Sequence, residues 1–330
     1  MELPQGPDSN GKIGKVHFGA GNLTGSTNQA LTARLKSYAN PGGKIRSQLV
    51  HFSSVRHFDE GQGNAVSQYE LALVYLRSNP ATPDYDSAIK WLRASASQGN
   101  APAEFMLGYL YEHGQGLPRD YAKAAENYLA AARGGHSVAA NNLASLYQHG
   151  QGIPKDLTKA LEWYLVAAHK AEPVAQCNLA TMYYYGYGTP RDYALAAKWF
   201  RAAAELGEAD AQHNLGVLYY KGLGVPSDYA EAAHWERLAA QQGQPRAEAE
   251  LAYLYESGKG IQLDYVAAYA WYSRAIAAGD STGAKFRKSL SRRMTRKQLD
   301  EANALVSAQS SQPRLSTSPV TGDLSLFEAH

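Results

Sequence analysis

The chain has 330 residues, of which 45% are hydrophobic and 19% charged, a composition typical of a soluble protein with one or two domains or one elongated array. Its 32 basic and 30 acidic residues leave a formal charge of only +2, which disfavours nucleic acid as a partner of the whole molecule. No run of about 18 apolar residues occurs, so no membrane span is predicted.

The first 64 residues are expected to contribute little to the core. Residues 1–27 lack periodic apolar residues and are predicted to be disordered. They show no basic segment followed by an apolar one, so no secretory signal is predicted, and the expected compartment is cytoplasmic. A signal upstream of this sequence would favour a periplasmic or envelope-associated location. Residues 28–64 keep only a weak echo of the repeat that follows and are predicted to form a degenerate N-terminal capping repeat.

Residues 65–280 carry a motif that recurs every 36 residues, which predicts six helix-turn-helix repeats. Each Gly-x-Gly pair precedes an Asp and an Ala at fixed distances, and in most repeats a Pro as well. The pairs are Gly114/Gly116, Gly150/Gly152, Gly186/Gly188, Gly222/Gly224 and Gly258/Gly260. In each repeat the first Gly is expected to end helix A in the left-handed conformation, and the Asp to cap helix B.

The segments between the turns have the apolar spacing of helices, predicted at 101–113 and 120–134 and at the positions 36 residues on. In helix A, Leu107, Leu110 and Tyr111 begin a stripe that recurs in later repeats. In helix B, one slot holds all five tryptophans, which are interpreted as core residues: Trp91, Trp163, Trp199, Trp235 and Trp271. Helix B is expected to end at a Gly in every repeat except one, where Ala171 stands instead. The fold class is therefore predicted to be all-α, a solenoid of stacked helix pairs.

Residues 281–308 are predicted to form C-terminal capping helices, and 309–330 a disordered tail. Thr295 and Gln298 resemble a capping box at the start of the last helix. The cap has no acid between Ser281 and Leu299. Its predicted basic patch consists of Lys285, Lys288, Arg292, Arg293 and Arg296. Candidate partners are an acidic protein, an anionic lipid surface or nucleic acid, and the alternative is a solvated face of the cap.

The motif resembles the Sel-one-like repeat, a 36-residue relative of the tetratricopeptide repeat. Residues 211–228 fit best, because they contain the series Leu-Gly-x-Leu-Tyr-x-x-Gly-x-Gly-x-Pro-x-Asp. The resemblance implies a right-handed superhelix of paired antiparallel helices and an adaptor role in signalling, polysaccharide secretion, host contact or protein quality control. A cysteine-rich branch of the family is linked to β-lactam binding or hydrolysis, but this chain has only Cys177 and departs from that branch.

Some helix A positions hold a different residue type from one repeat to the next. They are expected to form a Tyr-rich concave surface that binds a partner protein or an extended peptide segment. They lie at residues 105, 109 and 112 and at the positions 36 residues on, opposite the repeated stripe. The predicted partner-binding residues are Phe105, Tyr109, Glu112, Asn141, Gln148, Tyr184, His213, Tyr220, Tyr253 and Glu256. The alternative is that the aromatic side chains among them fill gaps between stacked helices.

The sequence contains no recognisable catalytic signature. The Gly pairs lack the remaining residues of dinucleotide and phosphate loops, the ten histidines show no zinc-site spacing, and no Gly-x-Ser-x-Gly elbow occurs. We therefore expect a monomeric, non-enzymatic adaptor without cofactor or metal. The alternatives are an envelope scaffold for polysaccharide or peptidoglycan machinery and, less favoured, a β-lactam-binding hydrolase.

Overall fold

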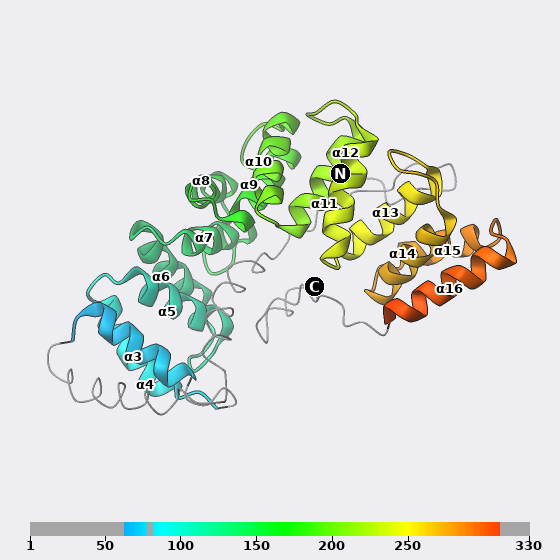
Figure 1. The fold of residues 1–330 in the computed structure, drawn as a ribbon. Helices are drawn as coiled ribbons and strands as arrows, with labels where there is room; N and C mark the ends of the chain where they lie inside the picture. Colours follow the sequence, from blue (N-terminus) through cyan, green and yellow to red (C-terminus); the bar gives the residue numbers. More distant parts are fainter. Residues whose placement is uncertain (1–62, 78–81, 311–330) are drawn as a thin grey trace. The chain divides into compact units, whose positions relative to one another are not determined.

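The helices follow one another in antiparallel pairs, each formed by a helix A and the helix B after it (Figure 1). This computed structural model describes residues 63–77 and 82–310, and every helix or strand in these ranges is an α-helix. The chain divides into two compact units between Ala175 and Gln176. The predicted segment 1–27, nearly all of the predicted capping repeat at 28–64 and residues 311–330 lie outside the described residues.

In the unit that ends at Ala175, each helix packs against the next one along the chain. Its helices are α3 (Ala65–Arg77), α4 (Tyr85–Ala96), α5 (Ala101–His113), α6 (Tyr121–Arg133), α7 (Ser137–His149) and α8 (Leu157–Ala168). Helix α9 (Pro173–Tyr185) contains the division. The helix predicted at 101–113 coincides with α5, because Asn100 caps its start and Gly114 ends it.

The unit that begins at Gln176 continues the same pattern of paired helices. Its helices after α9 are α10 (Tyr193–Glu205), α11 (Ala209–Lys221), α12 (Tyr229–Gln241), α13 (Pro245–Ser257), α14 (Tyr265–Ala277), α15 (Thr282–Ser291) and α16 (Arg296–Ser310). Both α15 and α16 pack against α14, and Leu290 of α15 is completely buried there. The predicted capping box is present, since the Gln298 amide donates to Thr295 Oγ1 at 3.3 Å and the Thr295 amide to Gln298 Oε1 at 2.9 Å. Helix α16 extends to Ser310, two residues beyond the predicted end.

The turn between helix A and helix B is built by the residues that the motif predicts. Gly114 has a φ of 66°, and its amide donates to the carbonyl of Leu110. The side chain of Asp120 accepts a hydrogen bond from the Lys123 amide at 3.0 Å. The same aspartate cap recurs at Asp84, Asp156, Asp192, Asp228 and Asp264. Both predicted roles, glycine termination of helix A and aspartate capping of helix B, are confirmed.

The second glycine of each pair has a role that the motif alone did not reveal. A Cβ at Gly260 would lie 1.9 Å from the carbonyl oxygen of Tyr229, and one at Gly224 would lie 2.1 Å from that of Tyr193. Tyr229 and Tyr193 each begin helix B of the preceding repeat. At Gly152, Gly224 and Gly260 a glycine is therefore required because two repeats approach each other backbone to backbone, whereas at Gly116 the nearest atoms belong to the side chain of Tyr85.

Helix B ends at glycines with positive φ, and Ala171 adopts the same conformation with a φ of 56°. Left-handed backbone costs an L-residue with a side chain roughly 1–2 kcal/mol. Ala171→Gly is therefore expected to stabilise the chain by about 0.5–1 kcal/mol, part of the gain being offset by the greater freedom of glycine in the unfolded chain. Urea denaturation checks this result.

The matched control for Ala171 is Gly207, which occupies the same slot and has open space around the position of a Cβ. Because no clash is possible there, Gly207→Ala measures the conformational cost alone and is expected to destabilise the chain by about 1 kcal/mol or more. An unchanged or lowered stability of Ala171→Gly would contradict the interpretation.

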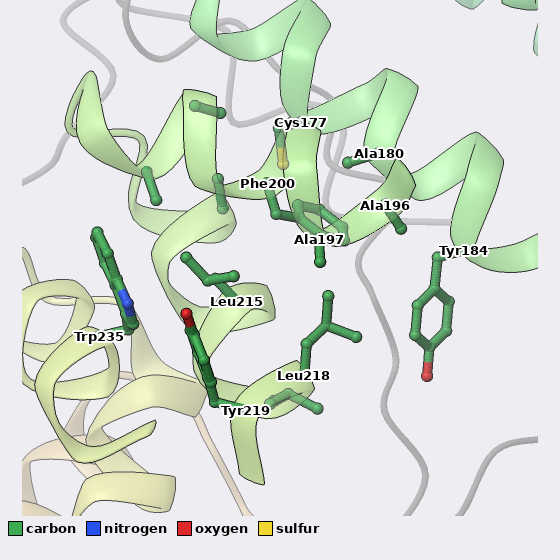
Figure 2. Close-up of a cluster of buried hydrophobic side chains, with 14 of the residues drawn as sticks. Cys177, Ala180, Tyr184, Ala196, Ala197, Phe200, Leu215, Leu218, Tyr219 and Trp235 are labelled. Atoms are coloured by element: carbon green, nitrogen blue, oxygen red, sulfur yellow. The ribbon is translucent and has the colours of Figure 1, made fainter. Parts of the chain in front are cut away.

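The buried aromatic slot of helix B follows the tryptophan slot by one residue, which corrects the interpretation of all five tryptophans as core. The side chains in the following slot are at most 1% exposed: Tyr128, Tyr164, Phe200 and Tyr272. Only Trp235 is buried, and the other four tryptophans are half-buried. Successive residues on a helix point about 100° apart, so only one of the two can face the interface directly. Figure 2 shows the cluster around Phe200, Leu215 and Leu218, with Trp235 and Tyr219 at one side.

Candidate functional site

Three of the ten predicted partner-binding residues are buried and are not part of an open surface. Asn141 is 4% exposed, Tyr184 2% and His213 5%. Asn141 donates to Asn142 Oδ1 at 3.3 Å, and the ring of Tyr184 makes edge contacts with those of Tyr185 and Tyr193. The prediction of these three as contact residues is wrong, because the helix A face opposite the repeated stripe also packs against neighbouring side chains.

Three more of the predicted residues hold helix A to helix B within a repeat. The hydroxyl of Tyr128 donates to Glu112 at 2.5 Å, that of Tyr164 to Gln148 at 2.9 Å, and that of Tyr272 to Glu256 at 3.0 Å. In each pair the two residues are 16 positions apart. Burial raises the pKa of Glu112. These acceptors satisfy tyrosine hydroxyls that would otherwise be buried without a partner.

Phe105 and Tyr109 lie in the unit that ends at Ala175 and are half-buried. The ring of Phe105 stacks on that of His136, the residue before α7, with centroids 4.4 Å apart. The ring of Tyr109 stacks on that of His113 one turn later, at 4.0 Å. Phe105 therefore fits the gap-filling alternative, since it closes the space between two successive repeats.

The repeat formed by α11 and α12 reverses the usual pair of side chains. Tyr220 occupies the slot of Glu112, Gln148 and Glu256, while Glu236 occupies the slot of the buried tyrosines. Glu236 is 2% exposed and its Oε2 lies 2.9 Å from Nδ1 of His213. Burial raises the pKa of Glu236 well above its usual value and lowers the pKa of His213 to about 4. Burial thus disfavours the charged form of each of these two side chains.

A small cavity lies beside this pair, between α11, α12 and α13. Its volume of about 10 Å³ is close to the space that one water molecule needs. It is lined by Gly216, Val217, Tyr220, Ala232, Glu236, Glu250 and Leu254. Burial raises the pKa of Glu250 to about 7, with a further contribution from Glu236. The cavity is too small for an organic substrate.

A cluster of three tyrosines surrounds Lys259, the residue between the two glycines of the α13–α14 turn. The ammonium nitrogen lies 4.9 Å from the ring centroid of Tyr220, 5.2 Å from that of Tyr229 and 5.6 Å from that of Tyr253. It donates to the hydroxyl of Tyr220 at 2.6 Å. The hydroxyls of Tyr220 and Tyr253 are 3.5 Å apart. Two of the predicted residues, Tyr220 and Tyr253, thus meet at one place on the unit that begins at Gln176.

The predicted basic patch is partly engaged within the chain. Arg293 donates to Glu256 at 2.5 Å and to the Tyr265 hydroxyl at 2.6 Å, so it fastens the cap to the last repeat. Lys285, Lys288, Arg292 and Arg296 are exposed. In the described ranges no group of three or more His, Cys, Asp or Glu side chains is placed to hold a metal ion. None of the described helices combines the length and apolar character of a membrane-spanning segment.

Sequence reasoning missed Glu236, Glu250 and Lys259 as members of this site. For all three a signal was present. Glu236 breaks an otherwise apolar or aromatic slot, and Lys259 is the one cation in its slot among the five glycine turns. Glu250 follows three repeats that hold Asn in its slot, at Asn142, Asn178 and Asn214. A residue that departs from a repeated slot marks a local change of interface.

The model of the Sel1 repeat family matches six stretches of this chain: 65–100, 101–136, 137–171, 173–208, 209–244 and 245–280. A Sel1 repeat protein from Oxalobacter formigenes is 32% identical, with a TM-score of 0.62 over 70% of this chain and 66% of that protein. A protective antigen of uropathogenic Escherichia coli strains is 24% identical, with a TM-score of 0.40 over 75% of this chain and 76% of the antigen.

An immunity protein from Pseudomonas aeruginosa is 18% identical, with a TM-score of 0.40 over 68% of this chain and 86% of that protein. Of the Oxalobacter formigenes protein, this chain covers just under two thirds of the length. No curated protein matches it. The six repeat matches place the chain in the Sel1 repeat family, whose repeats form generally non-catalytic scaffolds typical of protein–protein interaction.

Proposed function

We propose that the chain is a non-enzymatic adaptor that binds a segment of a partner protein on the helix A side of the repeats formed by α11 to α14. The observation that carries the proposal is the group of Tyr220, Tyr229 and Tyr253. Large aromatic side chains contribute most of the contact energy at protein interfaces and lose little conformational entropy on binding. Tyr229 is 40% exposed, so part of this surface is open to a partner.

The arrangement of Tyr220 supports the proposal further. In three other repeats the side chain of this slot accepts a hydrogen bond from a helix B tyrosine of its own repeat. Tyr220 instead meets Tyr229 and Tyr253, with ring centroids 5.1 and 6.2 Å away. A preorganised aromatic surface suits an extended segment better than a small molecule, and the cavity that Tyr220 helps to line holds no more than a water molecule.

The test begins with the partner that the wild-type chain captures from its source organism, identified by mass spectrometry and then purified. Replacing Tyr220 and Tyr253 together with Ala is expected to raise the dissociation constant at least tenfold, because both rings leave the surface. The matched control is Tyr147→Ala, a half-buried tyrosine of a repeated helix A slot in the other unit. Circular dichroism checks that helicity is unchanged. Full affinity of the double variant for the purified partner rules out this surface.

A further inference from the structure

Lys259 occupies its position because of the turn that carries it. Gly258 and Gly260 flank it, and the close approach of Gly260 to the backbone of Tyr229 brings the turn against the start of α12. The residue between the two glycines thus lies beside the preceding repeat. The other turns place Gln115, Gln151, Tyr187 and Leu223 in this slot.

The ammonium group of Lys259 is fixed but not neutralised. It donates one hydrogen bond, to Tyr220, and three rings lie within 5.6 Å of it. Among the residues that the structure describes, no carboxylate lies within ion-pair distance of it. An ammonium group has three N–H donors. Two N–H donors of this half-buried cation therefore have no acceptor among the described residues.

Two other lysines show what a compensated arrangement looks like in the same fold. Lys123 lies over the ring of Tyr111 at 5.4 Å and pairs with Asp120 at 3.6 Å. Lys159 repeats this pattern 36 residues later, over Tyr147 and beside Asp156 at 3.5 Å. Each has one ring and one carboxylate, whereas Lys259 has three rings and no carboxylate.

We infer that Lys259 and its three tyrosines recognise an acidic side chain, Asp or Glu, in the segment that the proposed adaptor binds. A cation that is already oriented by rings loses little entropy when it pairs, and its partial burial strengthens the attraction to a carboxylate. Charge-assisted hydrogen bonds from the remaining N–H groups fix the carboxylate, while the rings contact the flanking residues of the segment. This inference depends on the proposed function, since it names the chemistry of the partner at the same surface.

The probe is a phage library of random twelve-residue peptides, selected on the immobilised full chain and, in parallel, on Lys259→Met. Met preserves the length of the stem and removes the charge. Among the peptides selected on the wild type, Asp or Glu is expected to be enriched at one position. That position should lie at a constant distance along the peptide from its apolar residues. Selection on Lys159→Met, the matched control, is expected to yield the same peptides as the wild type.

A double-mutant cycle then measures the contact directly. For a synthesised peptide, changing the enriched acid to its amide is expected to weaken binding to the wild type at least tenfold and binding to Lys259→Met by less than twofold. Lys259→Arg is expected to recover part of the affinity, because it keeps the charge. Thermal denaturation confirms that each variant is folded.

The outcomes separate the inference from the proposed function. Peptides that depend on Tyr220 and Tyr253 but show no acid enrichment, or lose equal affinity on amidation in both backgrounds, overturn the inference and leave the proposed function standing. Peptides that bind independently of Tyr220, Tyr253 and Lys259, or a selection that yields no peptide at all, count against both.

Discussion

Gly260→Ala is expected to destabilise the chain by about 2–5 kcal/mol, the sum of roughly 1–2 kcal/mol for a left-handed backbone and about 1–3 kcal/mol for overpacking. The added Cβ would lie 1.9 Å from the carbonyl oxygen of Tyr229 and 2.1 Å from its carbonyl carbon. These are main-chain atoms at the start of α12, so no rotamer change can relieve the contact. The turn must move away from the preceding repeat, and Lys259 moves with it. Urea denaturation followed by circular dichroism measures the loss.

Gly258→Ala is the control within the same turn. Gly258 has nearly the same φ, 67° against 66°, but the nearest atom to its Cβ position is a side-chain carbon of Leu263 at 3.2 Å. The expected cost is therefore the conformational one, about 1–2 kcal/mol. Equal losses for the two variants would show that the close approach of repeats contributes nothing, and that both glycines act only through their φ.

The repeated features of the fold were predictable because the same interface is formed again and again. Asp120 and its equivalents cap helix B in every repeat, so six copies of one requirement appear as one period in the sequence. The slots of Leu107 and Leu110 recur for the same reason, since both side chains are buried. The second glycine was visible as a pattern, but its cause lies in a contact with residues 31 positions earlier, which spacing alone does not display.

The candidate site was predicted less well because two different causes make a slot vary. The residue at a given position of the repeat varies when its side chain faces solvent. It also varies when two side chains that pack against each other are replaced together. Glu256 with Tyr272 and Tyr220 with Glu236 are opposite arrangements at the same 16-residue spacing. Treating each slot separately hides this relation, so His213 was predicted to be a contact residue although it is the buried partner of Glu236.

The half-buried carboxyl group of Glu250 and the buried imidazole of His213 are expected to make the stability of this unit depend on pH. Burial raises the folded-state pKa of Glu250 from 4.5 to about 7, so the folded chain holds a proton that the unfolded chain releases. The stability that this proton gives is fully present below about pH 4.5 and is lost as the pH rises through 7. Burial lowers the pKa of His213 from 6.5 to about 4, so its contribution has the opposite sign and is lost as the pH falls from 6.5 towards 4.

Glu250→Gln is expected to separate these two effects. The amide cannot ionise, so the variant should be more stable than the wild type at pH 8, by about 2–3 kcal/mol, and nearly equal to it at pH 4.5. Urea midpoints measured between pH 4.5 and 8 give this difference. The control is Glu205→Gln, an exposed residue at the end of α10, which is expected to show no such trend. A stability difference that is the same at both pH values would mean that the pKa of Glu250 is the same in the folded and the unfolded chain.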